Sequence, residues 1–511
     1  MNNPARDSAG SPAGSPVSDP AGDSASSPAG DSAGSPAGAS FNPAPDAPSR
    51  LTAEDLDARL ARYAHLVIRS GVALRPGQDL YLSISTDCLP FARLLTKEAY
   101  RAGARRVTVR LSDEAIVRLT YDNCPVEVFE VYPEWLALMN NSIARSAAAV
   151  LFVTSENPQA LAGVDPMKLV ANARAAHVAC KEFYDAQAQG RLVWCIVGAA
   201  SPAWARHVFP GLPDDEAVLK LWEALFKTVR LDAPDPVEAW SQHQQSFNER
   251  IVWLTRERFD RLHYTNSLGT DLMVGLNSRG IWKGGGDAVV EDADGGAADA
   301  GAAAEAGAAA EAGAGEAGAN ADAGSAGSTS AGARSTEGGG RWFFPNMPTE
   351  EIFTTPDRLR AEGIVFSSMP LVHNGSIVDG FSLTFENGTV TDCSAREGLD
   401  VLKSILATDE GARRLGEVAL VPWTSPIRES GLLFYNTLYD ENASCHLALG
   451  LGFPDCLEGG VRMSEEEYVA AGVNKSAAHV DFMIGTADLQ ITGIRADGTE
   501  VPIFQAGEWA F

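Results

Sequence analysis

Residues 79–111 have the sequence DLYLSISTDCLPFARLLTKEAYRAGARRVTVRL, in which two apolar runs flank a segment with helical spacing. We predict strands at 79–86 and 105–111, and a helix at 91–104 that ends near a glycine. Two strands joined by a crossover helix pair in parallel. The stretch therefore predicts an α/β domain built on a mostly parallel sheet.

The same alternation of helix and strand extends on both sides of this stretch. Helical spacing recurs at 51–71 and 168–187, and apolar runs typical of buried strands recur at 147–155 and 191–200. Thr52 is the expected N-cap of the first helix, with Asp55 three residues later. Apolar strands that alternate with helices indicate a sheet covered on both faces. We assign residues 50–238 to this α/β domain.

The chain changes character after Ala239, where short strands and turn signals prevail. β-branched residues and NG, DG and GT turns mark the segments 261–276, 363–395, 416–423, 480–494 and 498–511. One helix is expected at about residues 398–415. We predict that residues 239–511 form a β-rich α+β domain.

Two segments lack the large apolar residues that a packed core requires. Residues 1–49 repeat SPAG and DSAG, without the apolar run of a secretory signal, and are predicted to be a disordered tail. Residues 288–339 combine alanine and glutamate with recurrent glycines, which predicts a disordered acidic insertion. Ordered patterns flank it, so we expect a loop expansion within the C-terminal domain.

Charge and cysteine content narrow the function class. The 511-residue chain has 40 Lys and Arg against 67 Asp and Glu, and no basic run, which argues against a nucleic-acid partner. The sequence contains no run of about 18 apolar residues, so we predict no membrane-spanning segment. The seven cysteines form no CxxC pair, which indicates reduced thiols and a cytoplasmic protein. No glycine-rich phosphate motif supports nucleotide binding.

His479 and Asp481 lie two residues apart in AHVDFMIGTADL, residues 478–489, which has the pattern of a buried strand. Side chains at i and i+2 of a strand share a face, so the pair has the geometry to bind one metal ion. Taken alone, the pair favours a histidine at the sheet rim that is hydrogen-bonded to its neighbouring aspartate.

Other side chains of the metal-ligating type also follow the insertion: Glu350 and Glu351 after NMPT, Glu417 in GEVALVP, and Glu441 and His446 in LYDENASCHLALG. Together with His479 and Asp481 they would offer mixed nitrogen and oxygen donors. Such a set suits zinc, cobalt or manganese better than calcium or magnesium.

Simpler roles are open for the same glutamates. Glu350 and Glu351 also fit the first turn of a helix capped by Thr349. Glu417 also fits an ion pair with Arg413 or Arg414, and Glu441 a turn cap. The long spacing is unlike the compact H-E-x-x-H signature, so spacing does not decide between these roles.

Four motifs in order, NMPTEEIFTTP, GEVALVP, LYDENASCHLALG and HVDFMIG, resemble those of the M29-type metalloaminopeptidases, the aminopeptidase T and aminopeptidase S group. The resemblance covers residues 51–511. It implies an enzyme that removes N-terminal residues from short peptides with water activated by two divalent metal ions per chain. The ligands implied are Glu351, Glu417, Glu441, His446, His479 and Asp481, with Glu350 as the alternative to Glu351.

The resemblance also implies a proton-transfer role for Glu351 or Glu417, and a homodimer that restricts access to the metals. One departure stands out, because the family commonly has a tyrosine where this chain has Phe453. The alternative hypothesis is therefore a catalytically impaired relative that binds metal or peptide. A metal-dependent hydrolase of another amide or ester is a third hypothesis, because the same ligands serve many substrates.

Overall fold

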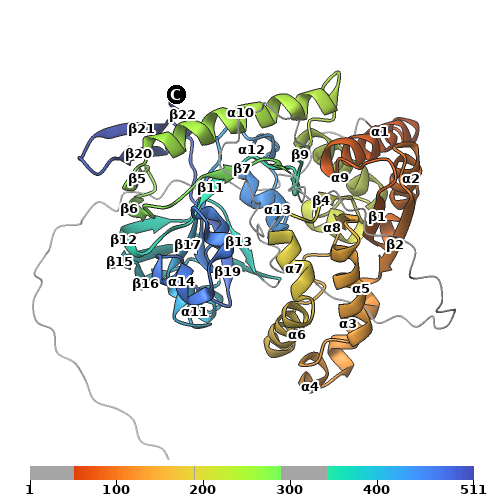
Figure 1. The fold of residues 1–511 in the computed structure, drawn as a ribbon, viewed down its shortest axis with the longest axis horizontal. Coiled ribbons are helices and arrows are strands. Elements are labelled where there is room, and N and C mark those ends of the chain that lie inside the picture. Colours follow the sequence, from red (N-terminus) through yellow and green to blue (C-terminus); the bar gives the residue numbers. More distant parts are fainter. Residues whose placement is uncertain (1–50, 189, 289–341, 374) are drawn as a thin grey trace, which may run out of the picture. The chain divides into compact units, whose positions relative to one another are not determined.

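The computed structural model describes residues 51–188, 190–288, 342–373 and 375–511. The predicted tail at 1–49 lies outside these residues, as does all of the predicted insertion except Ala288. Figure 1 shows the described elements.

A parallel sheet forms the N-terminal part, as predicted. Its strands are β1 (Asp79–Ser85), β2 (Arg106–Ser112), β3 (Ala149–Thr154) and β4 (Trp194–Gly198), in the order β4-β3-β1-β2. Every pairing among them is parallel. The connections pass through helices, which is the arrangement expected for such a sheet.

A fifth strand of this sheet comes from the C-terminal part of the chain. β10 (Asn346–Met347) pairs in parallel with β4, with Asn346 opposite Ile196 and Met347 opposite Val197. A two-residue strand has no periodicity of its own, so the sequence did not predict it. It anchors the segment that leads to Glu350 and Glu351.

Nine helices accompany this part in the described residues: α1 (Ala53–Leu66), α2 (Leu89–Arg101), α3 (Glu114–Asn123), α4 (Val126–Phe129), α5 (Glu134–Arg145), α6 (Pro166–Ala179), α7 (Lys181–Ala188), α8 (Pro202–Val208) and α9 (Asp214–Thr228). The Thr52 cap is confirmed, because Thr52 and Asp55 form both bonds of a capping box. The prediction of a single helix at 168–187 is wrong. The segment forms two helices separated at Cys180, whose φ of −98° and ψ of 28° leave the helical region.

The C-terminal part is rich in strands, as predicted, and contains two large sheets. The five-stranded sheet has the order β19-β18-β17-β11-β7, with β7 (Lys283–Gly284), β11 (Ile352–Thr354), β17 (Leu415–Leu420), β18 (His446–Gly450) and β19 (His479–Met483). All of its pairings are antiparallel, and every residue of its five strands is buried.

The eight-stranded sheet has the order β16-β15-β12-β6-β5-β20-β21-β22. Its strands are β5 (Arg261–Thr265), β6 (Asp271–Leu276), β12 (Pro356–Phe366), β15 (Ser382–Glu386), β16 (Thr389–Ser394), β20 (Gln490–Ile494), β21 (Glu500–Gln505) and β22 (Glu508–Trp509). The two sheets share an apolar core, to which Leu262 and Leu272 contribute from one sheet and Val418 and Leu447 from the other.

Helix α10 (Pro236–Glu257) runs along the strands of this part (Figure 1), and its Phe247 and Leu254 belong to the shared core. The predicted division between residues 238 and 239 falls inside this helix, and the domain limits stay a prediction. The helix predicted at about 398–415 is too long. α11 (Leu399–Leu406) ends early, because the Asp409 carboxylate accepts from the N–H groups of Ala412 and Ala477, and such bonds compete with helix continuation.

The described ends of the insertion lie side by side. β8 (Asp287–Ala288) pairs with β9 (Trp342–Phe343), with Asp287 opposite Phe343. A short hairpin of β13 (Leu371–His373) and β14 (Ser376–Val378) follows later in the chain. The remaining described helices are α12 (Pro426–Glu429), α13 (Thr437–Asp440) and α14 (Glu465–Ala470).

The carboxyl ends of β3 and β4 contact the segment that contains α13. The Trp204 indole donates to Phe434 O, and the Asn436 amide donates to Thr154 Oγ1 at 3.0 Å. The Tyr439 hydroxyl lies against Gly198, where a Cβ would come within 2.0 Å. Only glycine allows this approach. The N-terminal sheet thereby fixes the chain immediately before Glu441.

Candidate metal centre

The register of the five-stranded sheet places four of the predicted ligands on one face. Opposed residues of antiparallel strands point to the same side. Glu417 is opposite Ala448, which is opposite Asp481, and His479 is opposite Gly450. His446, two residues before Ala448, shares this face. The HxD pair of β19 therefore lies next to the histidine of β18 and the glutamate of β17.

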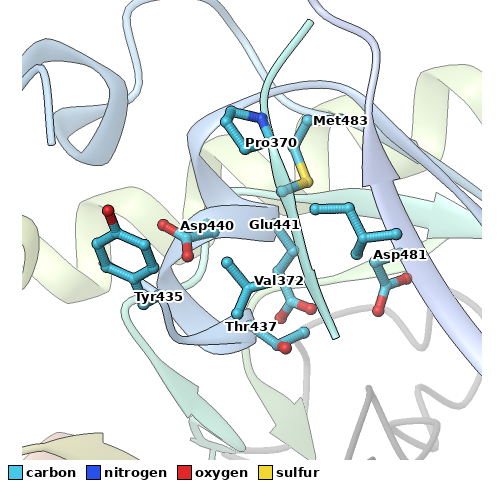
Figure 2. Close-up of a pocket in the computed structure, with 9 residues that line it drawn as sticks. Pro370, Val372, Tyr435, Thr437, Asp440, Glu441, Asp481 and Met483 are labelled. Carbon is cyan, nitrogen blue, oxygen red and sulfur yellow. The ribbon is translucent and has the colours of Figure 1, made fainter. Parts of the chain in front are cut away.

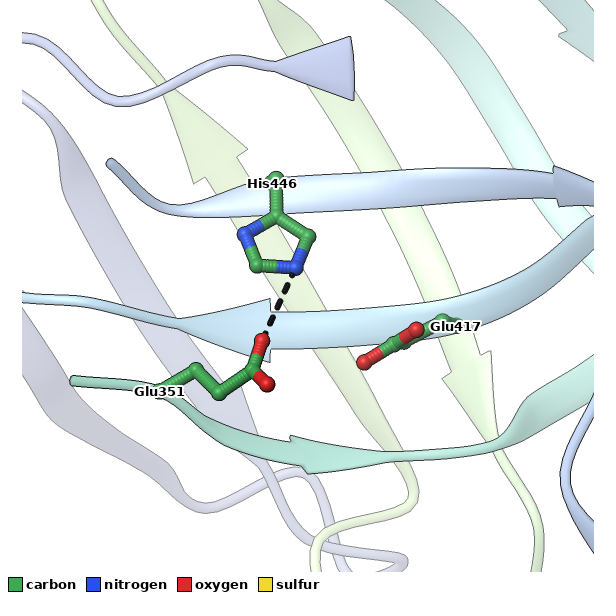
Figure 3. A group of neighbouring side chains, drawn as sticks. All are labelled: Glu351, Glu417 and His446. Carbon is green, nitrogen blue, oxygen red and sulfur yellow. Dashed lines mark ion pairs between the residues drawn. The ribbon is translucent and has the colours of Figure 1, made fainter. Parts of the chain in front are cut away.

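Glu351, Glu417 and His446 form one cluster (Figure 3). His446 Nε2 lies 3.2 Å from Glu351 Oε2. One potential ligand atom from each residue lies within 4.8 Å of the other two. Figure 3 shows the carboxylates of Glu351 and Glu417 turned toward each other, with the imidazole beside them. Glu351 reaches this place from the residue just before β11.

Glu417 also belongs to a second cluster, with His479 and Asp481. His479 Nε2 lies 3.2 Å from Glu417 Oε2 and 3.3 Å from Asp481 Oδ1. Glu417 thus lies between two potential ligand groups. All three side chains are at most 8% exposed.

Backbone carbonyl groups orient both imidazole rings. His446 Nδ1 lies 3.1 Å from Ser444 O, and His479 Nδ1 lies 2.8 Å from Leu451 O. A hydrogen on Nδ1 satisfies these carbonyls, so Nε2 is the ring nitrogen that faces the carboxylates and can bind a metal once it is deprotonated. This is the tautomer that a metal-binding histidine requires.

Glu441 lies near the clusters without joining either of them among the described residues. Its carboxyl is 4% exposed and accepts a 3.3 Å contact from the Asn442 amide. Burial raises its pKa well above the ordinary value, and the charges of Glu351 and Asp481 raise it further. The predicted ligand role of Glu441 stays a prediction.

Burial and crowding shift the pKa values of the clustered groups in the metal-free protein. Burial, with the charges of Glu351 and Asp481, raises the pKa of Glu417 to about 7. Burial lowers the pKa of His446, but the ion pair with Glu351 outweighs it, so the pKa rises to about 9. For Asp481, burial raises the pKa, but His479 outweighs it and holds the pKa below the ordinary value.

Glu417 Oε1 is buried without a hydrogen bond within the part of the chain that the structure describes, and Glu351 Oε2, His479 Nε2 and Asp481 Oδ1 have no partners beyond the ion pairs given above. Buried polar atoms normally have partners, and leaving them without one costs free energy. Nitrogen and oxygen donors of this kind fit zinc and related divalent cations. The residues present therefore fit a metal-binding site.

The simpler roles considered for Glu350, Glu351 and Glu417 are wrong, whereas the turn-cap role considered for Glu441 stays a prediction. Residues 349–351 form no helix, and β11 begins directly afterwards at Ile352. Arg413 donates to Val390 O and Arg414 pairs with Glu410, so neither pairs with Glu417. Glu350 does not replace Glu351 in the cluster, because Arg230 holds its carboxylate at 2.6 and 2.8 Å.

A small pocket, with a cavity volume of about 30 Å³, adjoins the clusters (Figure 2). Glu441 and Asp481 form part of its wall. Pro370, Leu371, Val372 and Met483 supply apolar lining, and Tyr435, Thr437 and Asp440 complete it. The pocket connects two of the predicted ligands with an apolar surface.

The sequence did not identify this pocket, although one signal for it was present. Met483 follows Asp481 by two residues in β19, so it had to share the ligand face. The β13 hairpin and Tyr435 lie far from these residues in the sequence and gave no such signal.

Comparison with known proteins identifies the family. A family model described as thermophilic metalloprotease (M29) matches residues 56–295 and 324–509, so the chain belongs to this family. The chain is therefore an enzyme, a metal-dependent hydrolase of peptide bonds. The interruption of the match, at 296–323, falls within the predicted insertion.

Similar proteins cover almost the same length. Aminopeptidase AmpS of Bacillus subtilis is 40% identical over 458 residues, which are 90% of this chain and 100% of the relative. Aminopeptidase T of Thermus thermophilus is 38% identical over 450 residues, 88% of this chain and 98% of the relative. The solved structure of wild-type AmpT from Thermus thermophilus aligns with a TM-score of 0.74 at 36% identity, covering 89% of this chain and 100% of that one.

Phe453 packs beside the second cluster. Its ring centroid is 4.9 Å from that of His479 and 5.8 Å from that of Phe353, and the side chain is 6% exposed. The residue thus lies next to the candidate metal centre. The comparisons give no support to the hypothesis of a catalytically impaired relative.

The pKa directions predict how pH changes metal binding. Both Glu417 and His446 have raised pKa values, so the metal-free fold retains protons that the unfolded chain loses. The stability contributed by these groups is lost as pH rises from 4.5 to about 7 for Glu417 and from 6.5 to about 9 for His446. Cations must displace the same protons. We expect added Zn²⁺ to raise the melting temperature more at pH 8.5 than at pH 6, measured by scanning calorimetry. An equal rise at both pH values would contradict this.

Proposed function

We propose that this protein is a metal-dependent aminopeptidase that removes N-terminal residues from short peptides with the help of two divalent ions. The observation that carries the proposal is the position of Glu417 between two ligand groups, Glu351 with His446 and His479 with Asp481. With both imidazoles neutral, two divalent cations would balance the four carboxylates of Glu351, Glu417, Glu441 and Asp481. Zinc, cobalt and manganese suit these donors.

Bound divalent ions would lower the pKa of a shared water and polarise the scissile carbonyl. A carboxylate of the chain must then accept a proton and return it to the leaving amine. We assign this role to Glu417, whose Oε1 has no hydrogen bond within the described residues and whose carboxylate belongs to both clusters. Glu351 is the alternative, because its carboxylate faces the same space (Figure 3).

Deep burial supports action on chain ends and short peptides. The six predicted ligands are between 1% and 8% exposed. A folded protein, or the middle of a long chain, is too wide to reach side chains buried this far. The N-terminus of a peptide can reach them through a narrow opening.

Hydrolysis of aminoacyl-anilides tests the proposed aminopeptidase activity directly. We expect hydrolysis of aminoacyl-anilides with a free α-amine, loss of activity with a chelator, and recovery when Zn²⁺, Co²⁺ or Mn²⁺ is returned. N-acetylated anilides are the control and should not react. Equal hydrolysis of acetylated substrates would favour the hypothesis of a hydrolase for other amides or esters.

The pocket beside Glu441 and Asp481 is the proposed site for the side chain of the first substrate residue. Its apolar lining, which includes Val372 and Met483 (Figure 2), favours aliphatic residues such as leucine. We expect Val372→Phe to lower kcat/KM for leucyl-anilide about 10-fold while alanyl-anilide changes little, because the larger ring fills the pocket. Val252→Phe, at a 49% exposed position on α10, is the matched control. A parallel loss for both substrates would place the first residue elsewhere.

We also propose a homodimer. Large apolar side chains are exposed on α3, α5 and α6: Ile116, Leu119, Trp135, Leu138, Met167, Val170 and Val178. Exposed apolar surface of this kind is typical of protein interfaces. Light scattering after size exclusion should give twice the 54.0 kDa mass of one chain. A single-chain mass at every concentration would contradict the dimer.

The cytoplasm is the proposed location. All seven cysteines are free thiols, which fits a reducing compartment. No helix in the described ranges has the length and apolar character needed to cross a membrane.

A further inference from the structure

Glu350 and Glu351 are adjacent in sequence but have different partners. Glu351 faces His446 in the metal centre, whereas Glu350 forms a two-bond ion pair with Arg230 at 2.6 and 2.8 Å. The Glu350 side chain is 4% exposed and that of Arg230 is 22% exposed. Two parallel bonds between a guanidinium and a carboxylate fix the orientation of both groups.

Arg230 is itself held in place from several sides. It follows α9 in the left-handed conformation, with φ of 56°, and its N–H donates to Lys227 O. A residue with a Cβ adopts this conformation at a cost, so the surroundings must stabilise it. The guanidinium carbon lies 5.6 Å from the centre of the Trp240 ring, which is fully buried.

His243 holds the backbone on the same side. Its Nε2 lies 2.9 Å from Thr349 O and 3.6 Å from Glu350 Oε2, and its Nδ1 lies 3.4 Å from Arg230 Nη2. The residue before the glutamate pair and the first glutamate are therefore both in contact with α10.

Asn442 joins this network to the other side of the centre. Its Oδ1 accepts from the Glu350 N–H at 2.6 Å, and its Nδ2 donates to Leu438 O at 2.9 Å and contacts Glu441 Oε1 at 3.3 Å. The side chain is fully buried. One amide thus links the backbone beside Glu351 with the carboxyl of Glu441.

Restraint of the segment that contains Glu350 and Glu351 affects how the neighbouring carboxylates are arranged. Glu351 lies among Glu417, Glu441 and Asp481, and like charges in a buried space repel one another. Without this restraint, the carboxylate of Glu351 would turn away from the neighbouring carboxylates until cations bound. Ligands held ready by their neighbours bind metal more tightly.

We infer that Arg230 is a positioning residue for the metal centre: by holding Glu350, together with the Asn442 amide, it fixes the segment from which Glu351 reaches the cluster. The inference rests on the metal-binding part of the proposed function. The α/β part of the chain thereby contributes to the centre through a residue that touches neither metal nor substrate.

Cobalt titration of the full-length, metal-free protein tests this role. Visible absorption of bound Co²⁺ reports coordination geometry, and the titration gives the dissociation constant. The variants are Arg230→Met, Arg230→Lys and Arg206→Met, each checked for folding by circular dichroism. Arg206 pairs with Asp214 on the surface at 2.8 Å and is the matched control for loss of an arginine ion pair. Glu350→Gln, with the same readouts, replaces Arg230→Met if that variant does not fold.

We expect Arg230→Met to weaken Co²⁺ binding about 10- to 100-fold and to change the cobalt spectrum, as removal of an outer partner of a ligand does. Arg230→Lys should recover part of the affinity, because an ammonium replaces the charge without the two-bond geometry. Arg206→Met should match the parent. Parent affinity and spectrum in Arg230→Met, even with a lower melting temperature, would overturn the inference and leave a purely structural ion pair. A parent that binds no Co²⁺ would instead contradict the proposed metal centre.

Discussion

Replacing His479 by alanine is expected to remove metal from the second cluster and to lower kcat/KM at least about 100-fold, because loss of a ligand exceeds the effect of losing an outer partner. His479 Nε2 is the atom that contacts both Glu417 and Asp481, at 3.2 and 3.3 Å. Plasma emission measures the metal content, and leucyl-anilide hydrolysis measures the rate.

His263→Ala is the matched control for this substitution. His263 pairs with Asp271 at 2.7 Å in the other large sheet, with a side chain that is 35% exposed. It should retain full metal content and activity. If His479→Ala also retained both, His479 and Asp481 would be an ordinary hydrogen-bonded pair.

Glu417→Gln is the second substitution with a large expected effect. Glutamine keeps the size of the side chain but cannot hold and release a proton. We expect kcat to fall about 100- to 10,000-fold, the usual contribution of a positioned acid–base group. The pH dependence of kcat should also lose its acidic limb. Because Glu417 lies in both clusters, some loss of metal affinity should accompany the change, so assays require saturating metal.

Glu257→Gln controls for loss of a partly buried, ion-paired carboxylate elsewhere. The Glu257 side chain is 9% exposed and pairs with Arg256 and Arg495. It should leave turnover unchanged. Full turnover of metal-loaded Glu417→Gln would transfer the proton-exchange role to Glu351, whose Gln variant would then be the inactive one.

The candidate metal centre shows the usual conflict between stability and function. Burial raises the pKa values of Glu417 and Glu441, which means that the metal-free fold disfavours their charged forms. An apolar core at this place would be more stable, but it would bind no cation. Metal binding is the condition under which the cluster stabilises the fold.

The sequence placed His479 and Asp481 on one face because strand geometry is local, and the resemblance to the M29 family implied the other candidate ligands. His479 and Asp481 share a face by the two-residue period alone, and His446 and Glu417 begin or enter strands with clear apolar patterns. The resemblance implied Glu351, with Glu350 as the alternative, and the structure places Glu351 in the cluster with Glu417 and His446. The sequence did not show how β17, β18 and β19 pair. The structure gives their antiparallel register, which places these side chains on one face.

The remaining features depend on contacts between distant segments. Strand β10 has two residues, and its partner β4 lies about 150 positions earlier, so no local pattern marks it. Arg230 and Glu350 are 120 residues apart, and neither belongs to a periodic run. The helix ends near Cys180 and Leu406 lie beside contacts with distant residues: the Asn141 amide donates to Ala179 O, and the Asp409 carboxylate accepts from the Ala477 N–H.

The number of metal ions per active chain tests the central claim most directly. Plasma emission on purified protein, measured beside leucyl-anilide turnover during stepwise return of Zn²⁺ to the metal-free enzyme, should show full activity at about two ions per chain. Full activity without metal, or saturation at a single ion, would contradict the two-ion centre built around Glu417.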